Sequence, residues 1–260
     1  MPDHFTLAAC AEFLWPDKPM PWRCSRLAEM GFQAAFWNWT SHDVDAMAAS
    51  GAEFAIMNGF LGGNLVDDEG ADEMLRTARE TAEVGKRLNC ARLCLTGADL
   101  LDGGSPRRPY PEVTDAHRTK ARDTLQRIAD LADELDVVFA LENLNVTVDH
   151  PGVPFYRAED TIALVSEIDR PGLVLNLDLY HAQIEEGNLI ETCRKALPWI
   201  GEVQVADVPG RFEPGTGEIN FNGIARALKE MGYAGTVTLE SNCSGTSEDA
   251  LEAFRAAFTV

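Results

Sequence analysis

Residues Leu173–His181 read LVLNLDLYH, a β-prone apolar run that contains one acid, Asp178, and ends on a histidine. Burying a carboxylate at the end of such a strand is costly unless a cation or hydrogen bonds compensate its charge. Three other strand-like runs in the chain also carry an oxygen-bearing side chain at or near their ends. The stretch therefore raises the question of which fold brings such strand ends together.

Outward from this stretch, strand-like and helix-like patterns alternate strictly. The sequence predicts eight strands, at Phe5–Cys10, Gln33–Trp37, Glu53–Asn58, Ala91–Leu95, Val137–Leu141, Leu173–Leu177, Glu202–Val205 and Thr236–Leu239. It predicts eight helices, at Trp22–Met30, Asp43–Ser50, Asp68–Leu88, Asp115–Leu135, Ala158–Ile168, Leu189–Leu197, Phe221–Met231 and Ser247–Phe258. Such alternation implies a parallel sheet, and eight units close naturally into a single (β/α)8 TIM barrel of class α/β. The main alternative, a doubly wound open sheet, would normally carry GxGxxG after its first strand, and this chain has none.

Length and composition are those of an ordinary globular protein. The 260 residues fit one barrel domain covering residues 1–260. Net charge is −20, with scattered basic residues, which argues against nucleic acid and anionic membranes as partners. We expect a cytoplasmic protein without a membrane span or a secretion signal, and the six cysteines, which form no CxxC pair, are expected to be free thiols.

Oxygen donors stand at the ends of four successive predicted strands. They are Glu142 after the fifth, Asp178 after the sixth, Gln204 within the seventh and Glu240 after the eighth. In a barrel these ends converge on one face, where three carboxylates cannot all stay ionised without a counter-charge. A hard, oxygen-only set favours Mn²⁺ or Mg²⁺ over zinc, with Co²⁺ as a further possibility, and no nucleotide cofactor is expected.

Each of these residues also has a plainer interpretation. A single glutamate at a strand end more often caps a helix or forms a salt bridge than binds a metal. An amide such as Gln204 can simply satisfy backbone groups, and His181 can be a structural residue beside the ligands rather than a substrate contact. The recurrence in consecutive units is what favours a metal site over these alternatives.

Several motifs in the second half resemble those of the hydroxypyruvate isomerase family. They are Asp178-Leu-Tyr-His181, Gln204-Val-Ala-Asp207, Pro214-Gly-Thr-Gly-Glu-Ile-Asn220, Gly232-Tyr-Ala-Gly235 and the terminal Glu240. That family is similar to the D-tagatose 3-epimerase group within the xylose isomerase-like barrels. The likeness is strong over Val137–Ser241 and elsewhere extends only to the order of elements.

The resemblance implies a metal held by Glu142, Asp178, Gln204 and Glu240, with His181 and Arg211 contacting substrate oxygens. It also implies isomerisation or epimerisation of a small sugar or hydroxy-keto acid. This agrees with general chemistry, because a Lewis acid acidifies the C–H next to a carbonyl and stabilises the enediolate. Two carboxylates, Glu142 and Glu240, would then move the proton as the catalytic pair. A homo-oligomer, dimer or tetramer, is similar to what relatives form.

Departures from the family pattern fall in the first half. Met57 stands before Asn58 where the family often has a histidine, and Asn143 follows Glu142 where proline is common. We place Asn58 in the substrate-binding set.

Aromatic residues are unusually frequent in the early loops, and we expect Trp15, Trp37 and Trp39 to form a pocket wall and Trp22 to pack in the core. Such a wall suits a ring or a larger ketose.

Other functions remain open at this point. The same enediolate could expel a β-hydroxyl, which would make the protein a lyase of the inosose dehydratase type. A non-catalytic carbohydrate-binding or partner subunit that kept the barrel would need no metal. A DNA-repair endonuclease is disfavoured, because it would need several histidine-rich zinc ligands and a basic groove. The loop Gly97–Pro111, rich in glycine and proline, is of the kind that forms a lid.

Overall fold

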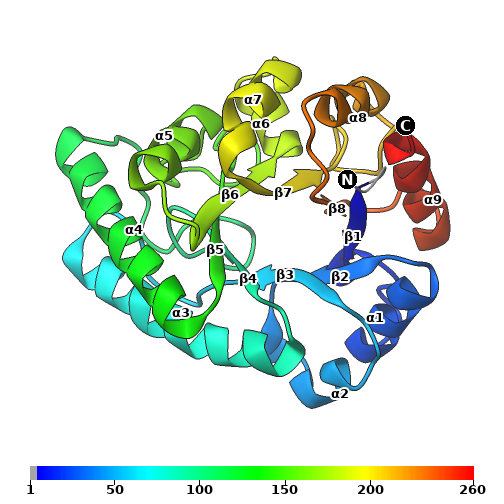
Figure 1. Ribbon diagram of the computed structural model, residues 1–260, viewed down its shortest axis with the longest axis horizontal. Coiled ribbons are helices and arrows are strands. Elements are labelled where there is room, and N and C mark those ends of the chain that lie inside the picture. Colours follow the sequence, from blue (N-terminus) through cyan, green and yellow to red (C-terminus); the bar gives the residue numbers. More distant parts are fainter. Residues whose placement is uncertain (1–4) are drawn as a thin grey trace.

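Eight parallel strands form a closed barrel in the computed structural model of the chain, which describes residues 5–260 (Figure 1). The strands are β1 Thr6–Cys10, β2 Gln33–Phe36, β3 Phe54–Asn58, β4 Arg92–Leu95, β5 Val138–Glu142, β6 Leu173–Asp178, β7 Ile200–Val205 and β8 Thr236–Leu239. Each strand pairs with the next, and β8 closes the barrel on β1 with Ala8 opposite Thr238. The predicted TIM barrel is confirmed.

The helices form a ring outside the strands (Figure 1). Over residues 5–260 they are α1 Met20–Glu29, α2 Val44–Ala48, α3 Asp68–Leu88, α4 Asp115–Leu135, α5 Ala158–Ile168, α6 Leu179–Glu185, α7 Leu189–Ala196, α8 Phe221–Glu230 and α9 Ser247–Phe258, with short 3-10 turns at Ala11–Phe13, Trp39–Ser41 and Leu197–Trp199. Several of these helices are capped at the N-terminus by a side chain that accepts a hydrogen bond from a backbone N–H group of the first turn. Asp67 accepts from the Gly70 N–H to start α3, and Thr114 accepts from the His117 N–H to start α4.

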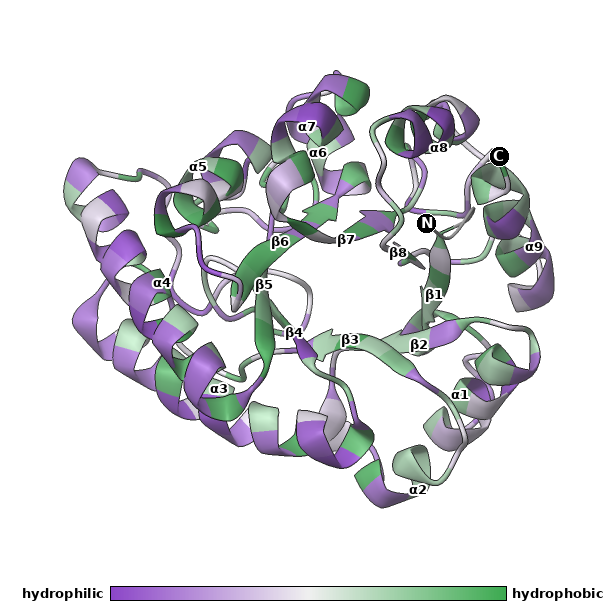
Figure 2. Cartoon of the chain, viewed as in Figure 1, coloured by the Kyte–Doolittle hydropathy of each residue, from purple (hydrophilic) through white to green (hydrophobic). Residues whose placement is uncertain are grey.

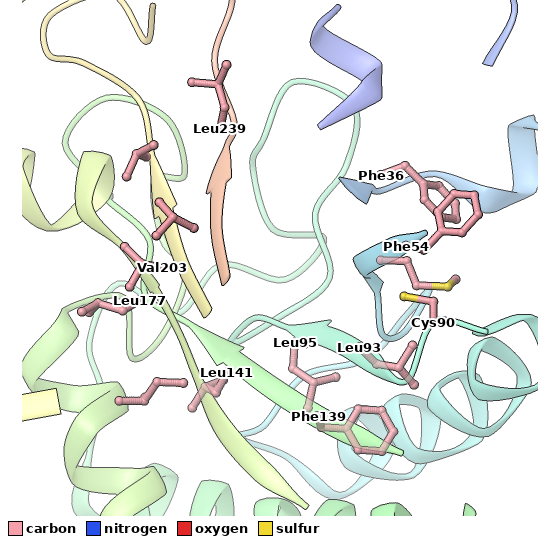
Figure 3. Close-up of a cluster of buried hydrophobic side chains, with 14 of the residues drawn as sticks. Phe36, Phe54, Cys90, Leu93, Leu95, Phe139, Leu141, Leu177, Val203 and Leu239 are labelled. Atoms are coloured by element: carbon pink, nitrogen blue, oxygen red, sulfur yellow. The ribbon is translucent and has the colours of Figure 1, made fainter. Parts of the chain in front are cut away.

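The core has two layers. Large apolar side chains such as Phe139, Leu177 and Val203 leave the outer side of the strands and pack under the helices (Figure 3). The inner side carries small residues, including Cys94 and Ala140. Figure 2 shows β5 and β6 as hydrophobic along most of their length, whereas the helices alternate between hydrophobic and hydrophilic. The burial of both faces explains why the strands are continuous apolar runs.

One helix is absent from the sequence-based prediction. Helix α6 begins directly after β6, because the Asp178 carboxylate accepts a hydrogen bond from the His181 N–H at 2.9 Å and caps the helix. Helix α6 starts inside the LDLYH motif, at Leu179, and continues past it to Glu185. The motif is therefore a strand-to-helix junction, and its apolar residues conceal the helix start.

Two further expectations need correction in the N-terminal third. Helix α1 begins at Met20 rather than Trp22, because proline is tolerated in the first turn, where Pro21 lies. Trp22 is 41% exposed, so the expectation that it packs in the core is wrong. No helix within residues 5–260 combines the length and the apolar character that crossing a membrane requires.

Candidate active site

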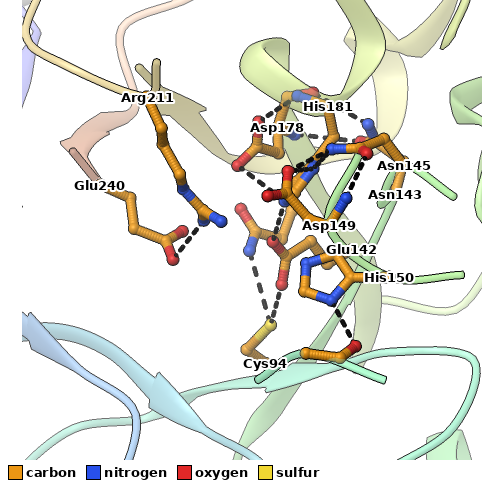
Figure 4. A network of polar contacts seen from close by, with 12 residues as sticks. Cys94, Glu142, Asn143, Asn145, Asp149, His150, Asp178, His181, Arg211 and Glu240 are labelled. Carbon is orange, nitrogen blue, oxygen red and sulfur yellow. Dashed lines mark hydrogen bonds and ion pairs between the residues drawn. The ribbon is translucent and has the colours of Figure 1, made fainter. Parts of the chain in front are cut away.

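The four predicted ligand residues lie together at the C-terminal mouth of the barrel. Figure 4 shows three of them, Glu142, Asp178 and Glu240. Glu142 ends β5 and Asp178 ends β6, next to Gln204 of β7, which is its register partner. Glu240 follows β8 immediately. All four side chains are buried. Parallel strands explain the convergence, because they deliver their last residues to one rim.

Burial makes ionisation of the three acids difficult. It raises the pKa of Glu142 well above its ordinary value, and the nearby charges of Glu240 and Asp178 raise it further. Burial also raises the pKa of Glu240 to about 7, against the opposing charge of Arg211. Burial likewise raises the pKa of Asp178 to about 6. A group of buried acids in this state has the character of a cation site.

Gln204 lies between two of these acids. The terminal atom of its amide that faces them lies 3.1 Å from Glu142 Oε1 and 3.1 Å from Glu240 Oε2. When this atom is the nitrogen, the amide donates to both carboxylates, and its oxygen accepts from Asn176. When it is the oxygen, three acceptors face one another, an arrangement that a bound cation or a proton on one of the carboxyl groups satisfies. The residue therefore fits both a metal-free and a metal-bound cluster.

His181 completes the cluster from the first turn of α6. Its ring, Glu142 and Asp178 each offer a ligand atom, and these atoms lie within 4.8 Å of one another. The His181 Nε2 atom is 4.0 Å from Glu142 Oε1 and 3.8 Å from Asp178 Oδ2, and it is buried without a hydrogen-bond partner among the described residues. A buried nitrogen left in this way is free to bond to a water or to a substrate oxygen in the cavity.

Asn145 determines which nitrogen of His181 carries the proton. Asn145 Oδ1 accepts the backbone N–H groups of Val148 and Asp149, each at 2.9 Å, so the amide nitrogen must face the histidine. That nitrogen lies 2.7 Å from His181 Nδ1, which therefore accepts, and the network assigns the proton to Nε2. A protonated nitrogen is a hydrogen-bond donor and not a metal ligand.

The two glutamates differ in their hydrogen-bond donors. Glu142 Oε2 accepts only a weak donor, the Cys94 thiol, at 3.0 Å (Figure 4). Glu240 Oε1 accepts from Arg211 Nη2 at 2.8 Å and from Trp37 Nε1 at 3.1 Å. The two carboxylates, both within reach of Gln204, thus occupy unequal environments, as an acid and base pair requires.

Arg211 is fixed over the mouth by aromatic rings. Its guanidinium carbon lies 5.0 Å from the ring centroid of Tyr180 and 5.6 Å from that of Phe13. Its backbone has a positive φ of 56°, which a non-glycine residue rarely adopts. The side chain is held between these rings while its end reaches Glu240.

A cavity of about 680 Å³ opens above the cluster, a size that suits a small molecule. The expected substrate-binding residues Trp37, Asn58, His181 and Arg211 line it, together with Glu142 and Glu240. Asp99, Leu100, Asp102 and Arg107 of the predicted lid segment also line it. Trp15 is not brought to this cavity, because it packs edge-on against Trp22, with ring centroids 5.6 Å apart.

The structure brings several residues to the site that the sequence did not single out. Asn143 exchanges two hydrogen bonds with the backbone of Asp178, at 2.8 and 3.0 Å. His150 Nδ1 lies 2.8 Å from the Gly104 carbonyl oxygen, and the His150 ring stands edge-on to that of His181. The run Glu142-Asn-Leu-Asn145, with three polar residues directly after a buried apolar strand, was the available signal for both asparagines.

Comparison with known proteins agrees with this architecture. Residues 24–258 match the family described as xylose isomerase-like TIM barrel. The 2-oxo-tetronate isomerase of Pectobacterium atrosepticum is 29% identical over 96% of this chain and 89% of its own length. The hydroxypyruvate isomerase of Escherichia coli is 31% identical over 50% of this chain and 50% of its own length.

The same likeness extends to a solved structure. The crystal structure of a protein titled AP endonuclease, family 2, from Brucella melitensis superposes with a TM-score of 0.82. The two sequences are 25% identical, and the match covers 96% of this chain and 98% of that one. Taken with the family match and the named isomerases, these findings confirm the resemblance that the DxYH and QxAD motifs carried. This chain is an isomerase that belongs to the xylose isomerase-like TIM barrel family.

Proposed function

We propose that the protein is a divalent-metal-dependent isomerase or epimerase of small α-hydroxy carbonyl compounds. The observation that carries the proposal is the convergence of Glu142, Asp178, Gln204 and Glu240 under one cavity, with the amide of Gln204 3.1 Å from both glutamates. Relatives named as isomerases of hydroxypyruvate and of 2-oxo-tetronate support this class of reaction.

The proposed ligand set is the four oxygen donors, and the proposed ion is Mn²⁺ or Mg²⁺, with Co²⁺ as a possible substitute. The protonated Nε2 of His181 favours this set over one that includes the histidine, because the hydrogen bond from Asn145 occupies Nδ1. When bound, the ion would supply Lewis acidity to the carbonyl and adjacent hydroxyl of the substrate.

The protein groups proposed for proton transfer are Glu142 and Glu240. One takes the proton from the hydroxyl-bearing carbon beside the carbonyl; the C–H electrons form a carbon–carbon double bond and the carbonyl π electrons move onto oxygen, which gives an enediolate. Return of the proton to the former carbonyl carbon, with transfer of the hydroxyl proton to the other oxygen, gives the isomer, and return to the opposite face of the first carbon gives the epimer. His181 and Arg211 line the cavity, and their proposed role is to donate hydrogen bonds to substrate oxygens.

The donor set also bears on the competing functions. Within residues 5–260 the one cluster of histidine, cysteine and acid side chains that could hold an ion contains a single histidine. The histidine-rich zinc set expected of an endonuclease on this barrel has no counterpart in it. A lyase would use the same groups but would eliminate water from the substrate. The mass of the product therefore distinguishes dehydration from isomerisation.

The test combines metal analysis with solvent exchange. Chelator-treated protein is reloaded with Mn²⁺ or Mg²⁺ and incubated with small ketoses and 2-oxo acids in deuterium oxide. We expect one tightly bound ion per chain and one deuterium per turnover in the product. Glu142→Gln and Glu240→Gln should each lower the exchange rate by about 10²- to 10⁴-fold.

Glu213→Gln is the matched control, because Glu213 is equally buried but accepts its hydrogen bonds from Ser244 and from none of the four proposed ligands. It should retain metal binding and exchange. Exchange that persists at the wild-type rate in metal-free protein, or in both cluster variants, would contradict the proposal. A product lighter by one water would support the lyase.

A further inference from the structure

His150 lines the cavity but belongs neither to the proposed ligand set nor to the proposed proton-transfer pair. It lies on the loop of residues 143–154, and the residue is only 8% exposed. Its ring stands edge-on to the ring of His181, with the two ring centroids 5.2 Å apart. The two imidazoles are therefore neighbours on one wall of the cavity.

The Gly104 carbonyl determines which nitrogen of His150 carries the proton. A carbonyl oxygen can only accept, and this one lies 2.8 Å from His150 Nδ1, so Nδ1 carries the hydrogen. Gly104 also packs closely on the ring, since a Cβ on this residue would lie 3.1 Å from Nδ1. Burial lowers the pKa of His150, so the ring is neutral at neutral pH and Nε2 keeps its lone pair.

The second nitrogen of His150, Nε2, is available to a ligand. It forms no hydrogen bond among residues 5–260, and it is not enclosed by protein as His181 Nε2 is. Figure 4 shows the His150 ring beside Glu142, with Nδ1 directed to the Gly104 carbonyl and the other nitrogen turned away from it. An accessible lone pair on a cavity wall can accept a hydrogen bond from a hydroxyl group.

The two histidines thus offer opposite groups to a bound molecule. His181 presents an N–H donor that lies near Glu142 and Asp178, whereas His150 presents an acceptor. A carbonyl oxygen or an oxyanion suits the first histidine, and a hydroxyl hydrogen suits the second. His181 adjoins the carboxylates proposed for the reaction, whereas His150 is held by the loop of residues 97–111, which also lines the cavity. A substrate whose reacting oxygens contact His181 would therefore place its next substituent beside His150.

We infer that His150 is a substrate-binding residue whose Nε2 accepts a hydrogen bond from a hydroxyl group beyond the reacting carbons. The inference rests on the proposed function and adds a binding contact to the same site. It applies to sugars and to hydroxy-keto acids alike, because both can carry such a hydroxyl. Its physical basis is that a compound without this hydroxyl would displace water from the lone pair and leave it unpaired.

Nitrogen-15 NMR of the imidazoles tests the tautomer without any turnover. With protein supplied with Mg²⁺, which is diamagnetic, we expect His150 to carry its proton on Nδ1 and to have an unprotonated Nε2. A His150 ring that is protonated on Nε2 would overturn the inference, whatever the activity of the protein.

A matched pair of substrates tests the contact itself. Erythrulose and 1,3-dihydroxybutan-2-one differ only in the terminal hydroxyl, and deuterium exchange is measured for both with Mg²⁺-loaded protein. We expect kcat/KM to favour erythrulose by at least about tenfold, and His150→Asn to reduce this ratio by about tenfold. The asparagine amide lies near the position of Nδ1, so it keeps a donor for Gly104 but removes the acceptor. No preference in the wild type, or an unchanged ratio in the variant, would overturn the inference.

His150→Gln is the complementary variant, because its amide lies near the position of Nε2. It can restore the acceptor but loses the donor to Gly104, and it should keep most of the preference for erythrulose. Equal losses in the asparagine and glutamine variants would mean that the contact with Gly104 sets the ratio, which would contradict the inference. His117→Asn is the control, since His117 caps α4 away from the cavity lining, and it should leave the ratio unchanged.

Failure of the inference can be distinguished from failure of the proposed function. Absence of exchange with every small ketose and 2-oxo acid tested would refute the proposed function, and the inference with it. Exchange of other compounds but not of erythrulose would refute the inference alone.

Discussion

His181 illustrates how a single buried residue obtains its chemistry from a neighbour. The ring is completely buried, and its Nε2–H faces Glu142 and Asp178 without a partner among the described residues. Asn145 fixes this tautomer. Its amide oxygen accepts from two backbone N–H groups, so its amide nitrogen must donate to His181 Nδ1. Asn145 is therefore a positioning residue, acting on the site through the imidazole.

Replacing Asn145 tests this role. Asn145→Leu removes the amide that donates to Nδ1, so the Nε2–H tautomer should lose its preference. We expect the exchange rate to fall by about 10- to 100-fold, as is typical for groups that orient a site residue. Nitrogen-15 NMR of the imidazole should show the change in the His181 tautomer directly.

Asn222→Leu is the control for loss of an asparagine side-chain hydrogen bond away from the site, because the exposed Asn222 of α8 donates to the Ala257 carbonyl of α9. It should alter neither the His181 resonances nor the exchange rate. An Asn145→Leu protein with wild-type imidazole resonances would show that the tautomer does not depend on this contact.

At the scale of elements, the loop of residues 97–111 is joined to the loop of residues 143–154 over the cavity. His150 contacts the Gly104 carbonyl, and the Tyr110 N–H donates to Gly152 at 2.7 Å. Gly97, at the base of the first loop, allows the closest approach, since a Cβ there would lie 2.0 Å from the Pro154 carbonyl oxygen. These contacts place Asp99, Asp102 and Arg107 on the cavity wall.

Gly97→Ala should disturb this junction. Because the clash is with backbone, the two loops must separate, and we expect a loss of about 1–3 kcal/mol in the free energy of unfolding, as for overpacking elsewhere. The KM for substrate should rise together with it. Chemical denaturation and exchange kinetics measure the two effects.

Gly62→Ala is the matched control in a neighbouring loop. The added Cβ would lie 3.4 Å from the Glu73 carboxylate, which is the movable end of a side chain. We expect little change in stability or KM. Equal losses in the two variants would mean that the approach of Gly97 to Pro154 is not what holds the loop.

At the scale of the molecule, barrel closure places three acids and an amide in a small buried volume. Burial and mutual repulsion raise the pKa of Glu142, so the cluster opposes folding unless its charge is compensated. The rest of the barrel tolerates this because apolar side chains fill the layer between strands and helices (Figure 3). Metal binding and stability should therefore be coupled.

Thermal and chemical unfolding with and without metal measure that coupling. An ion present at about 100 times its Kd should raise the free energy of unfolding by about 2.7 kcal/mol. Asp178→Asn should lose most of this increment, whereas Glu213→Gln should keep it. An increment that is the same in wild type and Asp178→Asn would mean that the ion binds elsewhere.

The sequence predicted the elements well, because their periodicity and caps are local. Helices α3, α4, α5 and α9 and strand β8 have the predicted bounds. Helix α6 was missed because its cap, Asp178, sits inside an apolar run that reads as a continued strand. The placement of Trp15 and Trp22 also could not be predicted, because an aromatic side chain in a loop packs on whatever the fold brings next to it.

The sequence by itself determined the strict strand and helix alternation, and hence the barrel and the rim at which Glu142, Asp178, Gln204 and Glu240 stand. Only the tertiary structure decided the contacts among them. The amide of Gln204 between two carboxylates, the His181 tautomer set by Asn145 and the pairing of Arg107 with Asp99 each join segments distant in the chain or depend on loop conformation. Strand order follows from local patterns, whereas hydrogen-bond direction and charge pairing depend on distances that exist only after the barrel has closed.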